Sequence, residues 1–176
     1  GVAAGGGILL EEASDLPVRH VTLSSNTADA TLAQGDHIHR GSGGGTVELR
    51  ASILGFVPDP CSTALGPLSS EGFNVSANAD PDCGLGSKDR AAAETGFSGG
   101  TADNGGRTPT IAIGPASAAL NLLPRKQCKG TDQRGISRRE GLGGERCDAG
   151  AYELAQCAGQ IIGRGAIIGT AKRDVL

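Results

Sequence analysis

Apolar and polar residues alternate along residues 46–54, where the apolar positions are Val47, Leu49, Ala51 and Ile53. Successive side chains of a β-strand point to opposite faces, so this alternation predicts a strand with one buried face. Residues 20–24 show the same pattern over a shorter length. Residues 88–94, in contrast, are too short and too poor in large apolar side chains to form a packed helix. The pattern therefore predicts an all-β protein built from short strands.

Glycine clusters recur ahead of the predicted strands. One cluster occupies residues 5–7 and a second lies within residues 41–45, so that two copies of a glycine, strand and turn pattern stand about 37 residues apart. Repetition of short β units is typical of a solenoid or of an array of sheets. An array of antiparallel hairpins is less favoured, because the tight Asn-Gly or Asp-Gly turns that join hairpin strands are missing between these strands.

The composition favours thin β layers over one large core. The chain has 176 residues, enough for one domain, and contains 30 glycines, 8 prolines, 3 phenylalanines, 1 tyrosine and no tryptophan. Its core must therefore consist of Val, Ile, Leu and Ala side chains. Methionine is also absent, from which we expect a processed product or part of a longer chain. No apolar run approaches the ~20 residues of a membrane-spanning helix.

The net charge of −3 is too small to indicate a strongly charged partner. Basic residues nevertheless gather in residues 125–146, which carry seven arginines and lysines against three acids. Nucleic-acid binding usually adds aromatic stacking partners or a known motif, and this segment has neither. We therefore expect a solvated basic loop and no nucleic-acid partner.

The five cysteines are Cys61, Cys83, Cys128, Cys147 and Cys157. None forms a Cys-x-x-Cys pair, so a zinc ribbon is not indicated. Cys61 and Cys83 flank one polar loop, and Cys128 and Cys147 flank the basic loop. We predict two local disulfides, 61–83 and 128–147, each stabilising the fold by roughly 3 kcal/mol and together indicating an oxidising compartment. Cys157 would remain a free thiol or pair with another chain.

Several short motifs together carry a family resemblance. They lie at residues 5–8 and 25–28, 43–47 and 51–53, 72–76 and 83–85, 103–106 and 108–110, 131–135 (Thr-Asp-Gln-Arg-Gly) and 147–153 (Cys-Asp-Ala-Gly-Ala-Tyr-Glu). In these motifs the chain resembles the C-terminal part of bacterial right-handed parallel β-helix proteins of the choice-of-anchor Q type, related to polymorphic outer-membrane-protein repeats. The likeness covers residues 5–153. Residues 30–42 look like an insertion in a repeat turn.

The resemblance implies an all-β fold, a right-handed parallel β-helix (solenoid) with few rungs and a disulfide-linked C-terminal cap. Rungs with loop insertions would occupy residues 1–127, the cap residues 128–153, and a tail of unknown role residues 154–176. The cap would cover the C-terminal end of the stack, because the ends of a solenoid expose unpaired backbone. The N-terminal edge would then meet another β-helix segment or a second copy of the chain.

Asp36, His37 and His39 are the best metal-binding candidate. Histidines two residues apart on a strand share a face, and an acid stands beside them. Two or three ligands on a glycine-flanked loop are few for a metal site, and a solvated turn is the preferred interpretation.

Four further aspartates could supply oxygen ligands for calcium, namely Asp59, Asp80, Asp82 and Asp103. Their proline and glycine neighbours also explain them as turn residues, which is the preferred interpretation. Apart from calcium, no cofactor is expected. Residues 74–76 (Asn-Val-Ser) form an N-glycosylation sequon, which matters only in a eukaryotic secretory setting.

Many right-handed β-helix proteins are polysaccharide lyases or glycosidases, which need a base with charge neutralisation or two placed carboxylates. Residues that could be given such roles are Arg134, Arg138, Arg139, Asp132 and Asp148. Asp132, Arg134 and Asp148 belong to the cap motifs, where we expect structural ion pairs, and no catalytic residue is assigned. The leading hypothesis is a non-enzymatic, extracellular or cell-surface scaffold or adhesive surface, with surface glycans as further partners. The alternative is the C-terminal part of a carbohydrate-active β-helix enzyme.

Overall fold

The computed structural model describes residues 2–11, 13–28, 32–43, 45–92, 95–139, 145–157 and 160–162. Within these residues the regular structure is strands and two 3-10 turns, so the protein is all-β as predicted. The strands are β1 (Val2–Ala4), β2 (Ile8–Leu10), β3 (Leu16–Arg19), β4 (Thr22–Leu23), β5 (Leu32–Gln34), β6 (Ile38–Arg40), β7 (Val47–Arg50), β8 (Ile53–Leu54), β9 (Cys61–Thr63), β10 (Ser69–Gly72), β11 (Val75–Ser76), β12 (Arg90–Ala91), β13 (Phe97–Ala102), β14 (Thr110–Ile113), β15 (Leu123–Pro124), β16 (Arg146–Cys147), β17 (Ala155–Cys157) and β18 (Gln160–Ile162). The 3-10 turns are η1 (Pro81–Cys83) and η2 (Arg125–Gln127).

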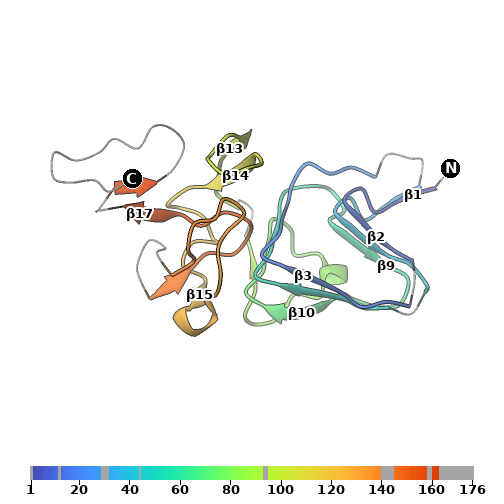
Figure 1. Cartoon of the computed structure of the whole chain (residues 1–176). Coiled ribbons are helices and arrows are strands. Elements are labelled where there is room, and N and C mark those ends of the chain that lie inside the picture. Colours follow the sequence, from blue (N-terminus) through green and yellow to red (C-terminus); the bar gives the residue numbers. More distant parts are fainter. Residues whose placement is uncertain are drawn as a thin grey trace.

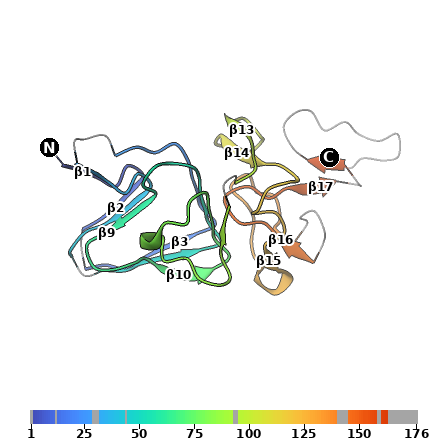
Figure 2. The same ribbon diagram turned by 180° about the vertical axis from the view of Figure 1, so that it is seen from behind.

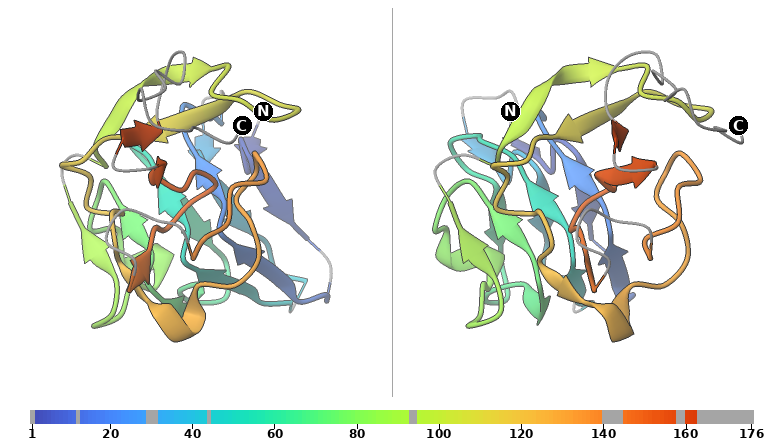
Figure 3. Two further views of the ribbon diagram at one scale, coloured as in Figure 1. Left: turned by 60° about the vertical axis from the view of Figure 1, so that its left-hand side comes forward. Right: turned by 90° about the vertical axis from the view of Figure 1, so that its left-hand side faces the viewer.

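The N-terminal half of the chain forms parallel sheets that it visits repeatedly in one order. A first pass contributes β1 to β4, a second β5 to β8 and a third β9 to β11, and β12 follows. These passes join β1 to β5, β2 to β6 and β9, β3 to β7 and β10, and β4 to β8, β11 and β12, always in parallel. Figure 3 shows strands of successive passes lying side by side.

The register of these sheets aligns buried and partly buried side chains of successive passes. Ile8 pairs with Ile38, and Ile38 pairs with Cys61. First-pass and second-pass partners are therefore 30 residues apart in β2 and β6, as the numbers 8 and 38 show, and the predicted spacing of 37 is wrong. Residues 30–42 are likewise not an insertion, because β5 and β6 within them pair with β1 and β2.

The predicted repeat was wrong because it aligned the glycine cluster at residues 5–7 with the cluster at residues 41–45. Gly5 is equivalent to Gly35 and not to the cluster at 41–45, since both stand just before the second strand of their pass with positive φ, 67° and 63°. A Cβ on Gly35 would lie 2.2 Å from the backbone oxygen of Ile38. The first two passes therefore share one positive-φ glycine at this corner, whereas the third pass reaches β9 without one. The other glycines of each cluster do not mark the repeat.

A second corner repeats in all three passes with non-glycine residues. His20, Ala51 and Phe73 have φ of 53°, 49° and 64°. They stand between β3 and β4, between β7 and β8, and between β10 and β11. The predicted strand at 46–54 is consequently two strands, β7 and β8, which meet at this corner. The alternation continues through this corner because Val47 and Leu49 lie in one hydrophobic core, whereas Ala51 and Ile53 lie in another.

Two hydrophobic cores result. One contains the residues Val18, Ile38, Val47, Leu49, Leu54, Cys61, Leu68 and Cys83. The other contains Ala51, Ile53, Val75, Ala112, Ile113, Ala119, Leu122, Leu123, Cys128, Cys147, Ala149, Tyr152 and Leu154. Neighbouring residues Ile53 and Leu54 of β8 are both fully buried and belong to different cores. Strand β8 is therefore apolar on both faces.

The C-terminal half covers the second of these faces. It contains the antiparallel pairs β13 with β14, β15 with β16 and β17 with β18. Figures 1 and 2 show it beside the parallel sheets. The closing segment, residues 128–153, reaches back to the first two passes, where the amide of Gly150 donates to the oxygen of Ala51 (2.7 Å) and that of Ala151 to Oγ1 of Thr22 (3.0 Å). It thus packs against the side of the stacked strands, instead of covering their C-terminal end as expected.

Both predicted disulfides are present. Cys61 and Cys83 are bonded with their Cα atoms 5.2 Å apart, and Cys128 and Cys147 with theirs 5.7 Å apart. The first links β9 to η1 within the parallel half, and the second lies in the core under the closing segment. Each half of the molecule therefore has its own covalent link.

Substitution of Gly150 tests the docking of the closing segment. A Cβ at this position, where φ is +87°, would lie 2.6 Å from Cδ1 of Ile53 and 2.7 Å from Oγ1 of Thr22. Gly135 has a similar φ of +93° and open space around it, so Gly135→Ala is the matched control for backbone strain. We expect Gly150→Ala to lower the free energy of unfolding by about 1–3 kcal/mol more than Gly135→Ala, from overpacking. Urea denaturation measures both, and equal losses would contradict the docking described.

Candidate functional site

The closing segment contains a cluster of charged side chains with almost no solvent exposure. We call Asp132, Arg134, Arg138, Asp148 and Glu153 the buried ion network. None of these side chains is more than 5% exposed. Isolated charges are costly to bury, so such a group must be paired and hydrogen-bonded throughout. Buried, paired charges of this kind are also common at functional sites.

Two arginines organise the buried ion network. Arg138 donates to Oε2 of Glu153 at 3.2 Å and to the backbone oxygens of Asp148 at 3.3 Å and Gly150 at 2.8 Å. Arg134 donates through Nε and Nη2 to Oδ2 of Asp132 at 2.9 and 2.7 Å, and to the backbone oxygen of Glu153 at 2.6 Å. Its guanidinium also lies 3.6 Å from the ring centroid of Tyr152, a cation–π distance.

The two aspartates hold backbone in place. Asp148 accepts from the amides of Asn121 and Leu154, both at 2.7 Å. Asp132 accepts from the amides of Ile136 and Glu153, both at 3.0 Å. Ile136 and Glu153 lie in the closing segment, Leu154 follows it directly, and Asn121 precedes it. The carboxylates therefore fasten loops together, and as arranged they present no face to a substrate.

The charges of the network do not balance. Three carboxyl groups face two guanidinium groups, so full ionisation would leave one buried negative charge. Burial and then the charge of Asp148 raise the pKa of Glu153 to about 8, while Arg138 opposes the shift. Burial also raises the pKa of Asp148 to about 6. Oε1 of Glu153 has no hydrogen-bond partner in the described structure, which agrees with Glu153 as the group that holds the extra proton.

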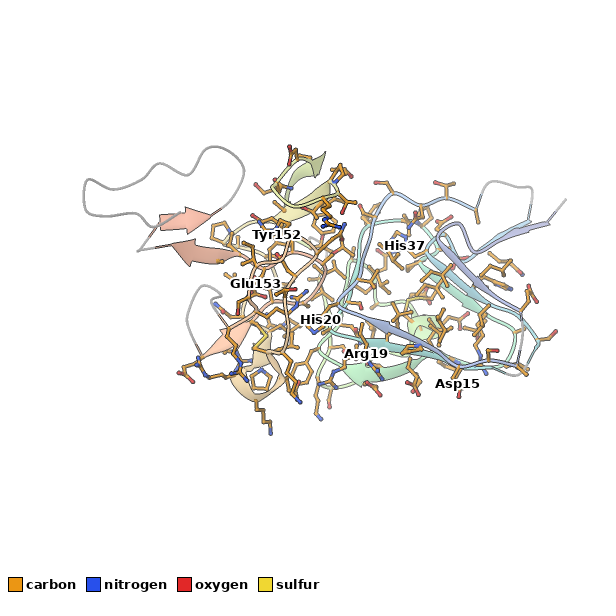
Figure 4. The ribbon with its side chains drawn as sticks, viewed as in Figure 1. Asp15, Arg19, His20, His37, Tyr152 and Glu153 are labelled. Atoms are coloured by element: carbon orange, nitrogen blue, oxygen red, sulfur yellow. A yellow bond between two sulfur atoms is a disulfide. The ribbon has the colours of Figure 1, made fainter. Side chains whose placement is uncertain are left out.

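His20 lies where the parallel sheets meet the closing segment, and Figure 4 shows it on the opposite side of that boundary from Glu153 and Tyr152. Burial first, and then the charges of Arg138 and Arg50, lower the pKa of His20 to about 4. Its Nδ1 is buried without a hydrogen-bond partner among the described residues. His20 is therefore neutral at pH 7. Nothing in its sequence surroundings had singled it out, because the arginine that faces it is 118 residues away, as the numbers 20 and 138 show.

Of the residues predicted to bind a metal, Asp36 and His37 make hydrogen bonds within the protein instead. Asp36 is buried, and its carboxylate accepts from the amides of Ala28 at 3.0 Å and Asp59 at 3.2 Å. His37 has no exposed surface, and its ring lies between Nδ2 of Asn26 at 3.1 Å and the oxygen of Gly55 at 3.0 Å. Metal binding at His37 would break one of these two bonds. His39 is also buried, and its Nδ1 has no partner in the described part of the chain.

The aspartates considered for calcium serve as turn residues. Oδ2 of Asp80 accepts from the amide of Cys61, and Oδ1 accepts from the amide of Asp82 at the start of η1. Oδ2 of Asp59 accepts from the amide of Gly35, and Oδ1 of Asp103 from that of Gly105. Among the described residues, no group of three or more His, Cys, Asp and Glu side chains is arranged to hold a metal ion.

The N-glycosylation sequon at residues 74–76 and the fifth cysteine, Cys157, were the remaining candidate features of the sequence. Asn74 of the sequon is fully buried and bridges passes, since its Oδ1 accepts from the amide of Ser52 and its Nδ2 donates to the oxygen of Leu49. It is therefore inaccessible to a glycosyltransferase in the folded protein. The side chain of Cys157 lies outside the described residues, as does most of the tail at 154–176.

The outer face of β3, β7 and β10 carries exposed ion pairs that run across the passes. Arg19 donates to Glu48 at 3.4 Å and to Glu71 at 3.3 Å, and Arg50 lies 3.8 Å from Glu71. Exposed pairs of this kind contribute little to stability, typically about 0–1 kcal/mol. They show, however, that opposite charges are matched across all three passes.

No protein-family model, curated protein or solved structure matches the chain. The family resemblance of the sequence motifs therefore stays a prediction.

The buried ion network predicts a stability that falls as pH rises. The folded-state pKa of Glu153 is raised above its unfolded value, so its stabilising effect is complete below pH 4.5 and is lost as pH rises toward 8. His20 has a lowered pKa and acts oppositely, losing stability as pH falls from 6.5 to 4. Between pH 6.5 and 8 the pH dependence of stability comes mainly from Glu153. The free energy of unfolding should therefore fall by up to about 1.4 kcal/mol per pH unit over this range.

Glu153→Gln, which mimics the protonated acid, should remove this slope. Glu145→Gln is the control, because that side chain is 82% exposed and should leave the slope unchanged. Denaturant titrations at pH 6.5, 7.25 and 8.0 measure it. A wild-type stability that is flat or rises over this range would show that Glu153 is ionised in the folded state.

Proposed function

We propose that this protein is a non-enzymatic structural scaffold in which the parallel sheets form the rungs of a right-handed parallel β-helix. The observation that carries the proposal is the repeat itself: three passes pair in parallel register through several sheets. The same corner adopts positive φ in each pass, at His20, Ala51 and Phe73. A repeated, stacked unit of this kind offers a long surface and few mobile parts, which suits a scaffold or an adhesive surface.

The chemistry of the closing segment favours this function over a carbohydrate-active enzyme. A glycosidase needs two carboxyl groups that reach its substrate, and a lyase needs an accessible base. Asp132 and Asp148, the acids considered for those roles, are 5% and 0% exposed and accept backbone hydrogen bonds. Arg134 and Arg138 are equally enclosed. All four are better explained as fasteners of the fold.

An extracellular or cell-surface location fits the same proposal. Two disulfides indicate that the protein folds in an oxidising compartment. Within the described residues, no helix is long and apolar enough to cross a membrane.

End-to-end association is the part of the proposal that concerns partners. The first-pass strands β1, β2, β3 and β4 each have one paired neighbour in their sheets within the described residues. In β2 the amide of Ile8 donates to His37 and the oxygen of Leu10 accepts from Gly41, so the amide of Leu9 points to the open edge. In β3 the equivalent position is Pro17, which has no amide hydrogen to donate. Pairing with a second copy therefore depends on β2 more than on β3.

Sedimentation velocity over a hundredfold concentration range tests association. We expect self-association that Leu9→Pro weakens, because the substitution removes the outward amide, whereas Leu9→Ala, which keeps the amide, has little effect. Slow hydrogen exchange at the Leu9 amide in concentrated samples is expected as well. A monomer at every concentration with rapid exchange at Leu9 would contradict end-to-end association.

Incubation with neutral and acidic polysaccharides tests the non-enzymatic part separately. We expect no new reducing ends and no unsaturated sugar products. Either product, lost in Asp132→Asn or Asp148→Asn variants that remain folded, would establish the enzyme instead.

A further inference from the structure

A cleft lies where three distant parts of the chain meet. It has a volume of about 250 Å³ and lies between β4 with the loop that follows it, the hairpin of β13 and β14, and the closing segment. The polar residues that line it are Thr22, Ser24, Asn26, Thr101, Thr110 and Gln133. Leu23, Pro109 and Ile111 supply apolar surface between them. At roughly 30 Å³ per water molecule, the space holds about eight waters, which is close to the size of one sugar ring.

The lining of the cleft is uncharged. Its polar groups are hydroxyls and carboxamides, and none of its lining residues is Asp, Glu, Lys, Arg or His. Two other depressions in the described surface differ, because one is lined in part by Asp80 and Asp89 and another by Glu71 and Lys88. Hydroxyls and carboxamides both donate and accept hydrogen bonds, so they suit an uncharged ligand whose own groups are donors and acceptors.

Several of these groups have hydrogen-bonding capacity to spare. In the described part of the chain, the hydroxyl of exposed Thr101 makes no hydrogen bond, and that of Ser24 meets only Ser25 at 3.4 Å. Gln133 donates through Nε2 to Oγ1 of Thr108 at 2.9 Å and to the backbone oxygen of Pro109 at 3.4 Å. Because that carbonyl can only accept, it fixes the amide and leaves Oε1 of Gln133 as an acceptor. The site therefore combines fixed and free groups.

His37 fixes the orientation of Asn26. The oxygen of Gly55 can only accept, so Nε2 of His37 carries the proton and its Nδ1 accepts. The atom 3.1 Å from Nδ1 must then be the donating Nδ2 of Asn26, and Oδ1 of Asn26 is left as an acceptor. Burial lowers the pKa of His37, which favours the neutral ring that this arrangement needs. The histidine considered for a metal thus acts as a positioning residue for the cleft.

We propose that this cleft binds one ring of a neutral glycan, with the hydroxyls and amides of Ser24, Asn26, Thr101 and Gln133 contacting sugar hydroxyls. The inference rests on the proposed scaffold function and names the contact site of its adhesive surface. The uncharged lining disfavours a uronate or a phosphate, which would lack a cation to pair with. An extended peptide is less well matched, because it pairs along a strand edge and not in a short cleft.

Backbone amide NMR titration tests the proposal with hexose, N-acetylhexosamine and pentose oligosaccharides, with oligogalacturonate as the anionic comparison. We expect at least one neutral oligosaccharide to shift the amides of residues 22–26, 101 and 133, with a dissociation constant on the order of 1 mM. Ser24→Ala, Asn26→Ala and Thr101→Val should each weaken binding roughly 2- to 12-fold, the effect of one hydrogen bond. Ser69→Ala and Thr131→Val, which remove hydroxyls elsewhere, should not.

The outcomes separate the two proposals. Absence of binding by every neutral oligosaccharide overturns the glycan site and leaves the scaffold function untouched. Preferred binding of oligogalacturonate, or of an uncharged pentapeptide with the same variant effects, overturns the ligand class. Cleavage of a bound oligosaccharide overturns the non-enzymatic function while it supports the site. His37→Phe should weaken glycan binding as Asn26→Ala does, and unchanged binding in that variant would refute the positioning role.

Discussion

The structure depends on one central strand, β8, that is apolar on both faces. In β8, Ile53 faces the C-terminal half and its neighbour Leu54 faces the interior of the parallel half, and both are fully buried. Burying an aliphatic side chain of this size contributes about 1.5–3 kcal/mol, so neither face can remain in water without a large loss. The outer face must be covered, and the only covering the chain provides among its described residues is its own C-terminal half.

That covering explains the buried charges. The closing segment is a series of loops with little regular pairing, and loops carry backbone groups that need partners when they are buried. Asp132, Asp148 and the two arginines supply those partners, as their bonds to the amides of Glu153 and Leu154 and to the oxygen of Gly150 show. Replacing such a network by apolar side chains often costs nothing in stability, so its effect is on geometry. It determines how the loops sit on the sheet.

The sequence revealed the local features and concealed the long-range ones. Alternation identified the strands around Val47 and Leu49 because it depends on the nearest neighbours alone. The disulfides were predictable because each joins cysteines about twenty residues apart. The register could not be predicted, because the pairing of Ile8 with Ile38 depends on contacts in the core. The glycine clusters used to align the repeat reflect the backbone geometry of corners instead. The position of the closing segment was hidden for the same reason, since Gly150 meets Ala51 across 99 residues, as the numbers 51 and 150 show.

The histidines show that residues with the spacing of metal ligands can have a different role in the folded protein. Asp36, His37 and His39 have the spacing of metal ligands, yet His37 is held between a carbonyl and a carboxamide and Asp36 between two amides. In both cases the partners come from other parts of the chain, which the folding of successive passes brings beside the motif. A buried imidazole with one accepting neighbour has a single tautomer available to it, and through that tautomer it decides which way Asn26 points. The chemistry of a residue in this fold is therefore set by the passes on either side of it more than by its neighbours in sequence.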